Sequence, residues 1–177
     1  MEHATFGGGC FWCLEPVFDG LRGVGQVTPG YAGGEVEHPS YEEVCGDRTG
    51  HAEVVDVVFD PEEISYEDLL EVFFAVHDPT TLNRQGADVG RQYRSVLFVR
   101  TQKQEEVARA FIAALPRDRA WQGQQIVTAI EPFTNFYPSE DYHRDYFRRN
   151  PGQGYCQVVI APKLAKFQKR FSGRLGI

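Results

Sequence analysis

The feature that most constrains the fold of this 177-residue chain is a β-branched run that leads at once into a helical pattern. Residues 54–59 read VVDVVF and end at an Asp-Pro pair, which is typical of a buried strand closed by a turn. Ser65 and Asp68 then form the pattern of a capping box, and apolar residues recur at helical spacing until Pro79. A strand followed by an amphipathic helix predicts a domain of packed strands and helices.

The same alternation continues toward the C-terminus. Residues 95–100 and 126–130 are predicted strands, and residues 101–115 form a predicted helix. After Pro138 the segment SEDYHRDYFRRN begins with Ser and acidic residues and ends with basic ones, which favours another helix. The polar segment 78–92 has no clear period, and loops of this length often carry function.

Composition indicates one domain covering residues 1–177, which we expect to be an α+β two-layer sandwich. The chain is 42% hydrophobic and 24% charged, and it has neither an apolar run of membrane-spanning length nor a signal-peptide pattern at its start. We therefore expect a cytoplasmic protein without a membrane partner. The formal net charge is −7 and most basic residues are scattered, so a nucleic-acid partner is not expected.

The run GGGCFWC at residues 7–13 raises the question of chemistry. Residues 5–6 are expected to end a strand and residues 11–21 to form a helix, which places Cys10 at the helix start. Unpaired backbone N–H groups there favour a thiolate, and the glycines allow another molecule to approach the backbone. Alternatively, Cys10 is a small buried hydrophobic residue beside a glycine turn.

Cys13 completes a CxxC pair, which suits thiol–disulfide exchange and also matches half of a zinc site. The second half is missing, because Cys45 and Cys156 stand alone in the sequence. One ExxH pattern ends at His143, but a di-iron site needs two such patterns and further glutamates. We therefore expect no metal, and the four cysteines suggest reduced or redox-active thiols.

Two aromatic residues, Phe11 and Trp12, directly follow Cys10. Such rings can enclose a methyl or thioether group, and both can instead pack in the core. Core packing is the stronger interpretation for Phe11. Trp12 is the better candidate for a pocket wall, because a buried indole N–H needs a hydrogen-bond partner.

Several motifs stand in one order: GCFW, GYAGG, HPSYEEVCGDRTGHAEVV, HDPTTLNRQGADVGRQYRS and NPGQGYC. With these motifs the chain resembles the peptide methionine sulfoxide reductases of the A type from about residue 6 to residue 156. The resemblance implies reduction of methionine S-sulfoxide, free or in proteins, by a thiol. It also implies a ferredoxin-like core around a mixed sheet with additional loops.

The resemblance assigns site residues that composition alone does not. It implies that Cys10 attacks the sulfoxide sulfur and becomes a sulfenic acid, that Glu53 is the proton donor, and that the Tyr41 and Tyr93 hydroxyl groups hold the oxygen. Glu53 precedes an apolar strand, where burial would raise its pKa. Asp88 is expected to organise the nearby loop or a water molecule, with an ordinary turn role as the alternative.

A second thiol must resolve the sulfenic acid. The family pattern favours Cys156, which we expect on a flexible glycine-rich segment able to swing inward. Cys13, where many relatives have glycine, is the alternative, and it could resolve the acid directly or relay a disulfide. The resemblance implies thioredoxin as the reductant and no other cofactor, and we expect a monomer.

Two other function classes remain open from the sequence. A general thiol–disulfide oxidoreductase would use Cys10 and Cys13 as the working pair, but it gives no role to the two tyrosines and Glu53. A non-catalytic module would bind a methyl-bearing or thioether ligand between the aromatic rings without using the thiol.

Overall fold

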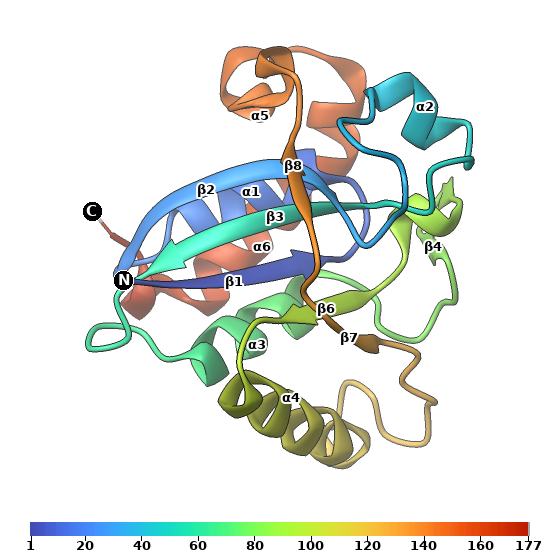
Figure 1. The fold of residues 1–177 in the computed structure, drawn as a ribbon. Helices are drawn as coiled ribbons and strands as arrows, with labels where there is room; N and C mark the ends of the chain where they lie inside the picture. Colours follow the sequence, from blue (N-terminus) through green and yellow to red (C-terminus); the bar gives the residue numbers. More distant parts are fainter. Residues whose placement is uncertain (177) are drawn as a thin grey trace.

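The computed structural model describes residues 1–176 and contains one six-stranded mixed sheet flanked by helices (Figure 1). The strand order is β7-β6-β1-β3-β2-β8, and every neighbouring pair is antiparallel except β6 and β7. These arrangements confirm the predicted α+β class. The strands are β1 (Glu2–Gly7), β2 (Val24–Ala32), β3 (Ala52–Phe59), β6 (Val96–Val99), β7 (Ala129–Pro132) and β8 (Phe136–Pro138).

An aromatic cluster joins the sheet to its two crossover helices. Phe6 of β1 stacks on Phe18 of α1 with ring centroids 5.0 Å apart, and on Phe73 of α3 with centroids 5.2 Å apart. All three side chains are completely buried, so they contribute strongly to the hydrophobic stabilisation of the domain. The helices are α1 (Phe11–Asp19), α2 (Tyr41–Cys45), α3 (Tyr66–Val76), α4 (Gln102–Ala114), α5 (Tyr146–Arg149) and α6 (Ala161–Arg170).

The predicted capping box is confirmed at the start of α3. The Ser65 hydroxyl accepts a hydrogen bond from the Asp68 N–H at 3.0 Å, and the Asp68 carboxylate accepts one from the Ser65 N–H at 3.0 Å. The predicted strands at 54–59 and 95–100 and the predicted helices at 11–21 and 101–115 correspond to β3, β6, α1 and α4. The local sequence pattern was therefore sufficient to predict these four elements.

Two predicted elements differ from the structure. The strand expected at 126–130 is β7, which begins at Ala129. The single helix expected after Pro138 is wrong, because Ser139 does not cap a helix and the segment forms two separate turns, Asp141–His143 and α5. Asp145 between them adopts a left-handed backbone conformation, φ 53°, and its N–H donates to the Glu15 side chain of α1 at 2.8 Å.

The region expected to be a long loop contains ordered structure. Within residues 78–92 lie the two-strand hairpin of β4 (Arg84–Gln85) and β5 (Asp88–Val89), and a short 3-10 turn at Arg91–Tyr93 follows it. In Figure 1 the end of β1, the start of β3, α2 and this hairpin gather at the right-hand end of the sheet. That end therefore brings together segments far apart in the sequence.

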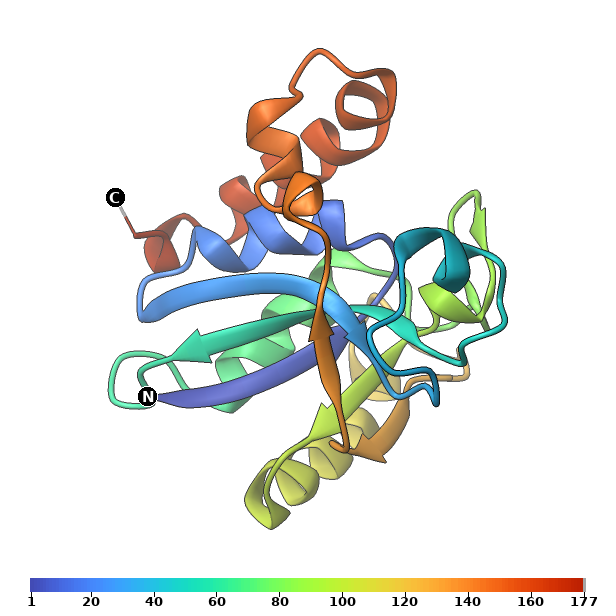
Figure 2. The same ribbon diagram turned by 45° about the horizontal axis from the view of Figure 1, so that its top comes forward.

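Figure 2 shows α1 and α6 together on one side of the sheet, while the chain that runs from β7 to β8 passes over the other side before β8 pairs with β2 at the edge. The chain between β8 and α6 covers the start of α1, where Trp12 contacts His143, Tyr146 and Tyr155. None of the helices in residues 1–176 combines the length and the apolar character that a membrane crossing requires.

Candidate functional site

The glycine loop between β1 and α1 lies tightly against two side chains. A Cβ at Gly8 would stand 2.8 Å from the Phe73 ring and 3.0 Å from the His77 ring. Gly9 has φ +94°, and a Cβ there would stand 2.9 Å from Gln85. Larger residues at these positions would displace the loop, so the glycines fix the place where α1 begins.

Cys10 is the N-cap residue of α1 and is 9% exposed. Burial raises the pKa of its thiol well above the ordinary value, and the nearby Glu53 and Cys13 raise it further, while the Trp12 backbone N–H acts in the opposite direction. The expectation that the helix start favours a thiolate is therefore wrong for the resting site. Burial has a larger effect than the helix terminus, and the thiol is protonated.

Glu53 of β3 is completely buried beside the same helix start. Its Oε1 accepts a hydrogen bond from the Phe11 N–H at 3.3 Å, whereas its buried Oε2 has no hydrogen-bond partner among residues 1–176. Burial raises the pKa of Glu53 to about 8, which confirms the predicted direction. At neutral pH the carboxyl group is mostly protonated.

Tyr41 and Tyr93 are half-buried and lie close to the same carboxyl group. Burial, and then the charge of Glu53, raises the pKa of each phenol above its ordinary value. Both hydroxyl groups therefore stay protonated and can donate hydrogen bonds. The structure thus brings together these two hydroxyls, the Glu53 carboxyl and the Cys10 thiol.

Glu140 ties the start of α2 to the sheet. Its Oε1 accepts a hydrogen bond from the Tyr31 hydroxyl at 2.9 Å, and its Oε2 accepts one from the Tyr41 N–H at 3.0 Å. Burial by itself would raise the pKa of Glu140, but these hydrogen bonds together lower it. A carboxylate that holds both groups fixes the position of Tyr41.

Asp88 of β5 accepts a hydrogen bond from the Tyr155 hydroxyl at 2.7 Å. The same hydroxyl lies 4.0 Å from the sulfur of Cys13, which is 4% exposed. Asp88 therefore reaches the thiol pair through Tyr155 and connects the β4–β5 hairpin to the C-terminal segment.

The two aromatic residues after Cys10 have different surroundings. Phe11 is completely buried and packs against Tyr31, with ring centroids 5.8 Å apart. Trp12 is half-buried, stacks on Tyr146 at 3.7 Å between centroids, and donates its indole N–H to His143 Nδ1 at 3.0 Å. The partner that the indole requires is thus a histidine that the sequence did not indicate.

Cys156 differs from its expected setting. Its side chain is completely buried, it begins a π-helical turn at Cys156–Ile160, and its N–H donates to the Gln153 side chain at 3.1 Å. The thiol is thus buried in this state, whereas the glycine-rich residues 151–154 before it are exposed. All four cysteines are free thiols, and Cys45 at the end of α2 is exposed.

Sequence reasoning missed four residues that frame the site: Tyr31, Glu140, His143 and Tyr155. The ExxH spacing of Glu140 and His143 was the available signal, and we interpreted it only as a possible metal motif. Within residues 1–176 no three His, Cys, Asp or Glu side chains gather closely enough to hold a metal ion.

The sequence model that describes peptide methionine sulfoxide reductase matches residues 2–175. The chain belongs to the peptide methionine sulfoxide reductase family. Among relatives in this family, the peptide methionine sulfoxide reductase MsrA of Deinococcus radiodurans is 58% identical over 175 residues, which cover 99% of this chain and 84% of that protein.

Solved structures of this reductase family have the same fold. Reduced Mxr1 from Saccharomyces cerevisiae superimposes with a TM-score of 0.77 at 37% identity, covering 88% of each chain. Mxr1 in complex with Trx2 superimposes with a TM-score of 0.53 at 28% identity, covering 82% of this chain and 84% of that one.

Proposed function

We propose that this protein reduces methionine S-sulfoxide, free or within polypeptides, to methionine. One observation carries the proposal: the Cys10 thiol lies beside a buried, protonated Glu53 whose Oε2 has no partner among the described residues. In the reductive step, the Cys10 thiol and the sulfoxide give a Cys10 sulfenic acid and methionine. The sulfoxide sulfur gains two electrons, the Cys10 sulfur loses two, and the oxygen moves from one sulfur to the other.

The departing oxygen needs a proton while the sulfur–oxygen bond breaks. Glu53 is suited to supply it, because the Phe11 N–H donates to Oε1 and Oε2 has no hydrogen-bond partner among residues 1–176. Hydrogen bonds from the Tyr41 and Tyr93 hydroxyls would hold the oxygen in place. The substrate methyl group would lie against the half-buried ring of Trp12, because the Phe11 ring is completely buried in the core, as the stronger interpretation from the sequence has it.

Release of methionine before any reductant is added tests this function. Stoichiometric protein is mixed with methionine S-sulfoxide or its R epimer, and free methionine is counted by chromatography. We expect about one methionine per protein within the first turnover from the S epimer and none from the R epimer. A general thiol–disulfide oxidoreductase or a binding module would release none from either epimer.

Glu140 acts in this proposal as a positioning residue for Tyr41. Glu140→Ala removes both acceptors and is expected to lower kcat/KM by about tenfold, because a charge-assisted hydrogen bond at Tyr41 is lost. The measurement is a double-mutant cycle with Tyr41→Phe.

In the Tyr41→Phe background, the further loss from Glu140→Ala should be less than about twofold if Glu140 acts through the phenol. Equal losses in both backgrounds would assign Glu140 a general structural role instead.

The first disulfide is proposed to join Cys10 and Cys13, with Cys156 second in a relay. Cys13 lies one helical turn from Cys10, and its N–H donates to the Cys10 carbonyl at 3.0 Å, which is the CxxC arrangement that supports disulfide exchange. Cys156 is among the charges that raise the pKa of the Cys13 thiol. These neighbours favour Cys13 over the Cys156 preferred from the sequence.

Peptide mapping by mass spectrometry after one turnover tests this order. We expect a Cys10–Cys13 disulfide at the earliest time in the wild type and in Cys156→Ser, with methionine release unchanged in Cys13→Ser. Cys45→Ser tests the remaining thiol, which is exposed beside the Tyr41 side chain at the end of α2, and it should give the same first disulfide as the wild type. A Cys10–Cys156 disulfide that forms first in the wild type would contradict the relay.

Regeneration needs an external dithiol, because two protein thiols become a disulfide in each cycle. We propose thioredoxin in this role, supported by the complex of Mxr1 with Trx2, and no resident cofactor. We also infer a single catalytic domain with a ferredoxin-like core. Support for that core comes from the antiparallel order β6-β1-β3-β2 and from the crossover helices α1 and α3.

A further inference from the structure

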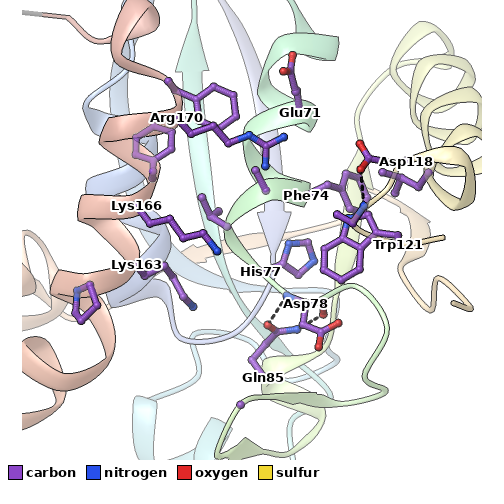
Figure 3. A pocket seen from close by; sticks show the side chains of 18 of the residues that line it. Glu71, Phe74, His77, Asp78, Gln85, Asp118, Trp121, Lys163, Lys166 and Arg170 are labelled. Atoms are coloured by element: carbon purple, nitrogen blue, oxygen red, sulfur yellow. Dashed lines mark hydrogen bonds between the residues drawn. The ribbon is translucent and has the colours of Figure 1, made fainter.

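A cavity of about 660 Å³ lies outside the site, between α3, the end of α4 and α6. Its volume is in the range of pockets that hold small ligands or short peptide segments. Figure 3 shows that its two sides differ in chemistry. Lys163, Lys166 and Arg170 project from α6 on one side and are called here the cationic wall. Phe74 and Trp121 lie on the other side, and with Phe111, whose ring stacks on Phe74 with centroids 5.5 Å apart, they are called the aromatic wall.

The cationic wall is available to an external anion. Among residues 1–176, none of its three side chains lies within ion-pair distance of a carboxylate. The chain as a whole carries a net charge of −7, so three cations facing one cavity are unusual for its surface. Such a wall favours a ligand with carboxylate groups.

Three carboxylates also line the cavity, and each already forms an ion pair or a hydrogen bond with a nearby residue of the protein. Glu71 forms an ion pair with Arg174 at 3.0 Å. Asp78 accepts a hydrogen bond from the Thr80 N–H at 2.9 Å, and Asp118 accepts one from the Ala120 N–H at 2.8 Å. The remaining titratable group that faces the cavity, His77, is neutral, because burial lowers its pKa to about 4.

The cavity adjoins the reductive site through the β4–β5 hairpin. Gln85 and Gly86 line the cavity, while Asp88, two positions further on, accepts the hydrogen bond from Tyr155 beside Cys13. Two residues of chain span at most about 7 Å. Lys163 is also close enough to the thiol pair for its charge to lower the pKa of Cys13. A polypeptide at the site therefore has this cavity within reach of its flanking residues.

We propose that the cavity binds an acidic segment of the oxidised polypeptide substrate. Its carboxylates lie against the cationic wall and its apolar side chains pack on the aromatic wall. This inference rests on the proposed function and adds a substrate class to it: proteins whose oxidised methionine has acidic and apolar neighbours in sequence. A concave cavity of this size suits a short segment better than the broad surface of a folded reductant.

The test compares two blocked methionine S-sulfoxide peptides that differ only in flanking residues, Asp and Glu in one and Lys in the other. N-acetyl-methionine S-sulfoxide methylamide is the reference substrate, and dithiothreitol is the reductant, so no protein reductant takes part. The readout is kcat/KM for each peptide divided by kcat/KM for the reference. We expect the acidic peptide to exceed the basic one by roughly tenfold at low salt, and the preference to shrink as salt is added.

The double variant Lys166→Glu/Arg170→Glu should abolish or reverse this preference, and the neutral pair Lys166→Gln/Arg170→Gln should give an intermediate value if the charge-reversed protein folds poorly. Lys169→Glu is the matched control, because Lys169 is exposed on the same helix and does not line the cavity. It should keep the wild-type preference.

Equal rates for the two peptides, or a preference that survives in both double variants, would overturn the inference. A raised KM for thioredoxin with an unchanged peptide preference would also overturn it and would assign the cavity to the reductant. Failure of the wild type to reduce the blocked reference substrate would instead count against the proposed function itself.

Discussion

Cys10→Ser is expected to lose methionine formation by more than about 10³-fold. A serine hydroxyl is a much weaker nucleophile than a thiol and cannot accept the sulfoxide oxygen to become a sulfenic acid. The substitution changes one atom at a 9% exposed position, so the fold should persist. The measurement is methionine released in a single turnover from methionine S-sulfoxide, with the melting temperature as a check on folding.

Cys45→Ser is the comparison for this experiment, because it makes the same atomic change at an exposed thiol that lies beside the Tyr41 side chain at the end of α2 rather than at the start of α1. It should lose far less of the rate of methionine release than Cys10→Ser. If Cys10→Ser kept a rate within tenfold of the wild type, Cys10 would not be the nucleophile, and the proposed mechanism would fail.

The elements that the sequence predicted well are those whose signals are local. The capping box of Ser65 and Asp68 and the apolar run of β3 involve residues close together in the chain, and both appear as expected. Strand β2 was missed because Pro29 and two glycines interrupt its pattern. The structure places Pro29 opposite Val55 of β3, and neighbours on both sides hold the strand in a sheet that its own composition does not favour.

The segment after Pro138 shows how distant contacts override local preference. Its acids and bases follow the order of a helix, yet Glu140 is used to hold Tyr31 and Tyr41, and the Asp145 N–H is bonded to Glu15. These partners lie about one hundred or more positions away in the chain, so no local pattern could reveal them. The helix therefore breaks where tertiary hydrogen bonds are formed.

The site was predictable in identity but not in its electrostatics. Motif resemblance named Cys10, Glu53 and the two tyrosines, which come from four separate segments of the chain, and the structure places them together. The charge state of Cys10 was predicted in the wrong direction, because the helix-start argument is local while burial depends on the whole fold.

Glu53→Gln is expected to slow the reductive step by about 10²-fold. The amide oxygen can still accept the hydrogen bond from the Phe11 N–H, so the geometry is kept, but the side chain has no transferable proton near neutral pH. The measurement is the single-turnover rate of methionine release. Glu43→Gln on the exposed side of α2 is the matched control and should keep the wild-type rate.

The pH dependence of that rate separates an acid from a merely structural carboxyl group. Burial raises the pKa of Glu53 to about 8, so the carboxyl group loses its proton as pH rises through that value. In a plot of the logarithm of the wild-type rate against pH, the line should turn downward near pH 8, with the slope expected for the loss of a single proton. Glu53→Gln should show no bend near pH 8. A bend that persists in the variant would assign it to another group and contradict the acid role.

Stability gives an independent check on the same proton. Because the folded pKa of Glu53 lies above its ordinary value, the folded protein retains a proton that the unfolded chain releases, and the contribution of Glu53 to the free energy of unfolding falls as pH rises from about 4.5 to about 8. Above about pH 8 both states are deprotonated and the contribution is constant. Denaturant titrations across this range give the free energy of unfolding at each pH, and it should fall more steeply with pH in the wild type than in Glu53→Gln. An equal pH dependence in the two proteins would mean that the folded carboxyl group titrates normally.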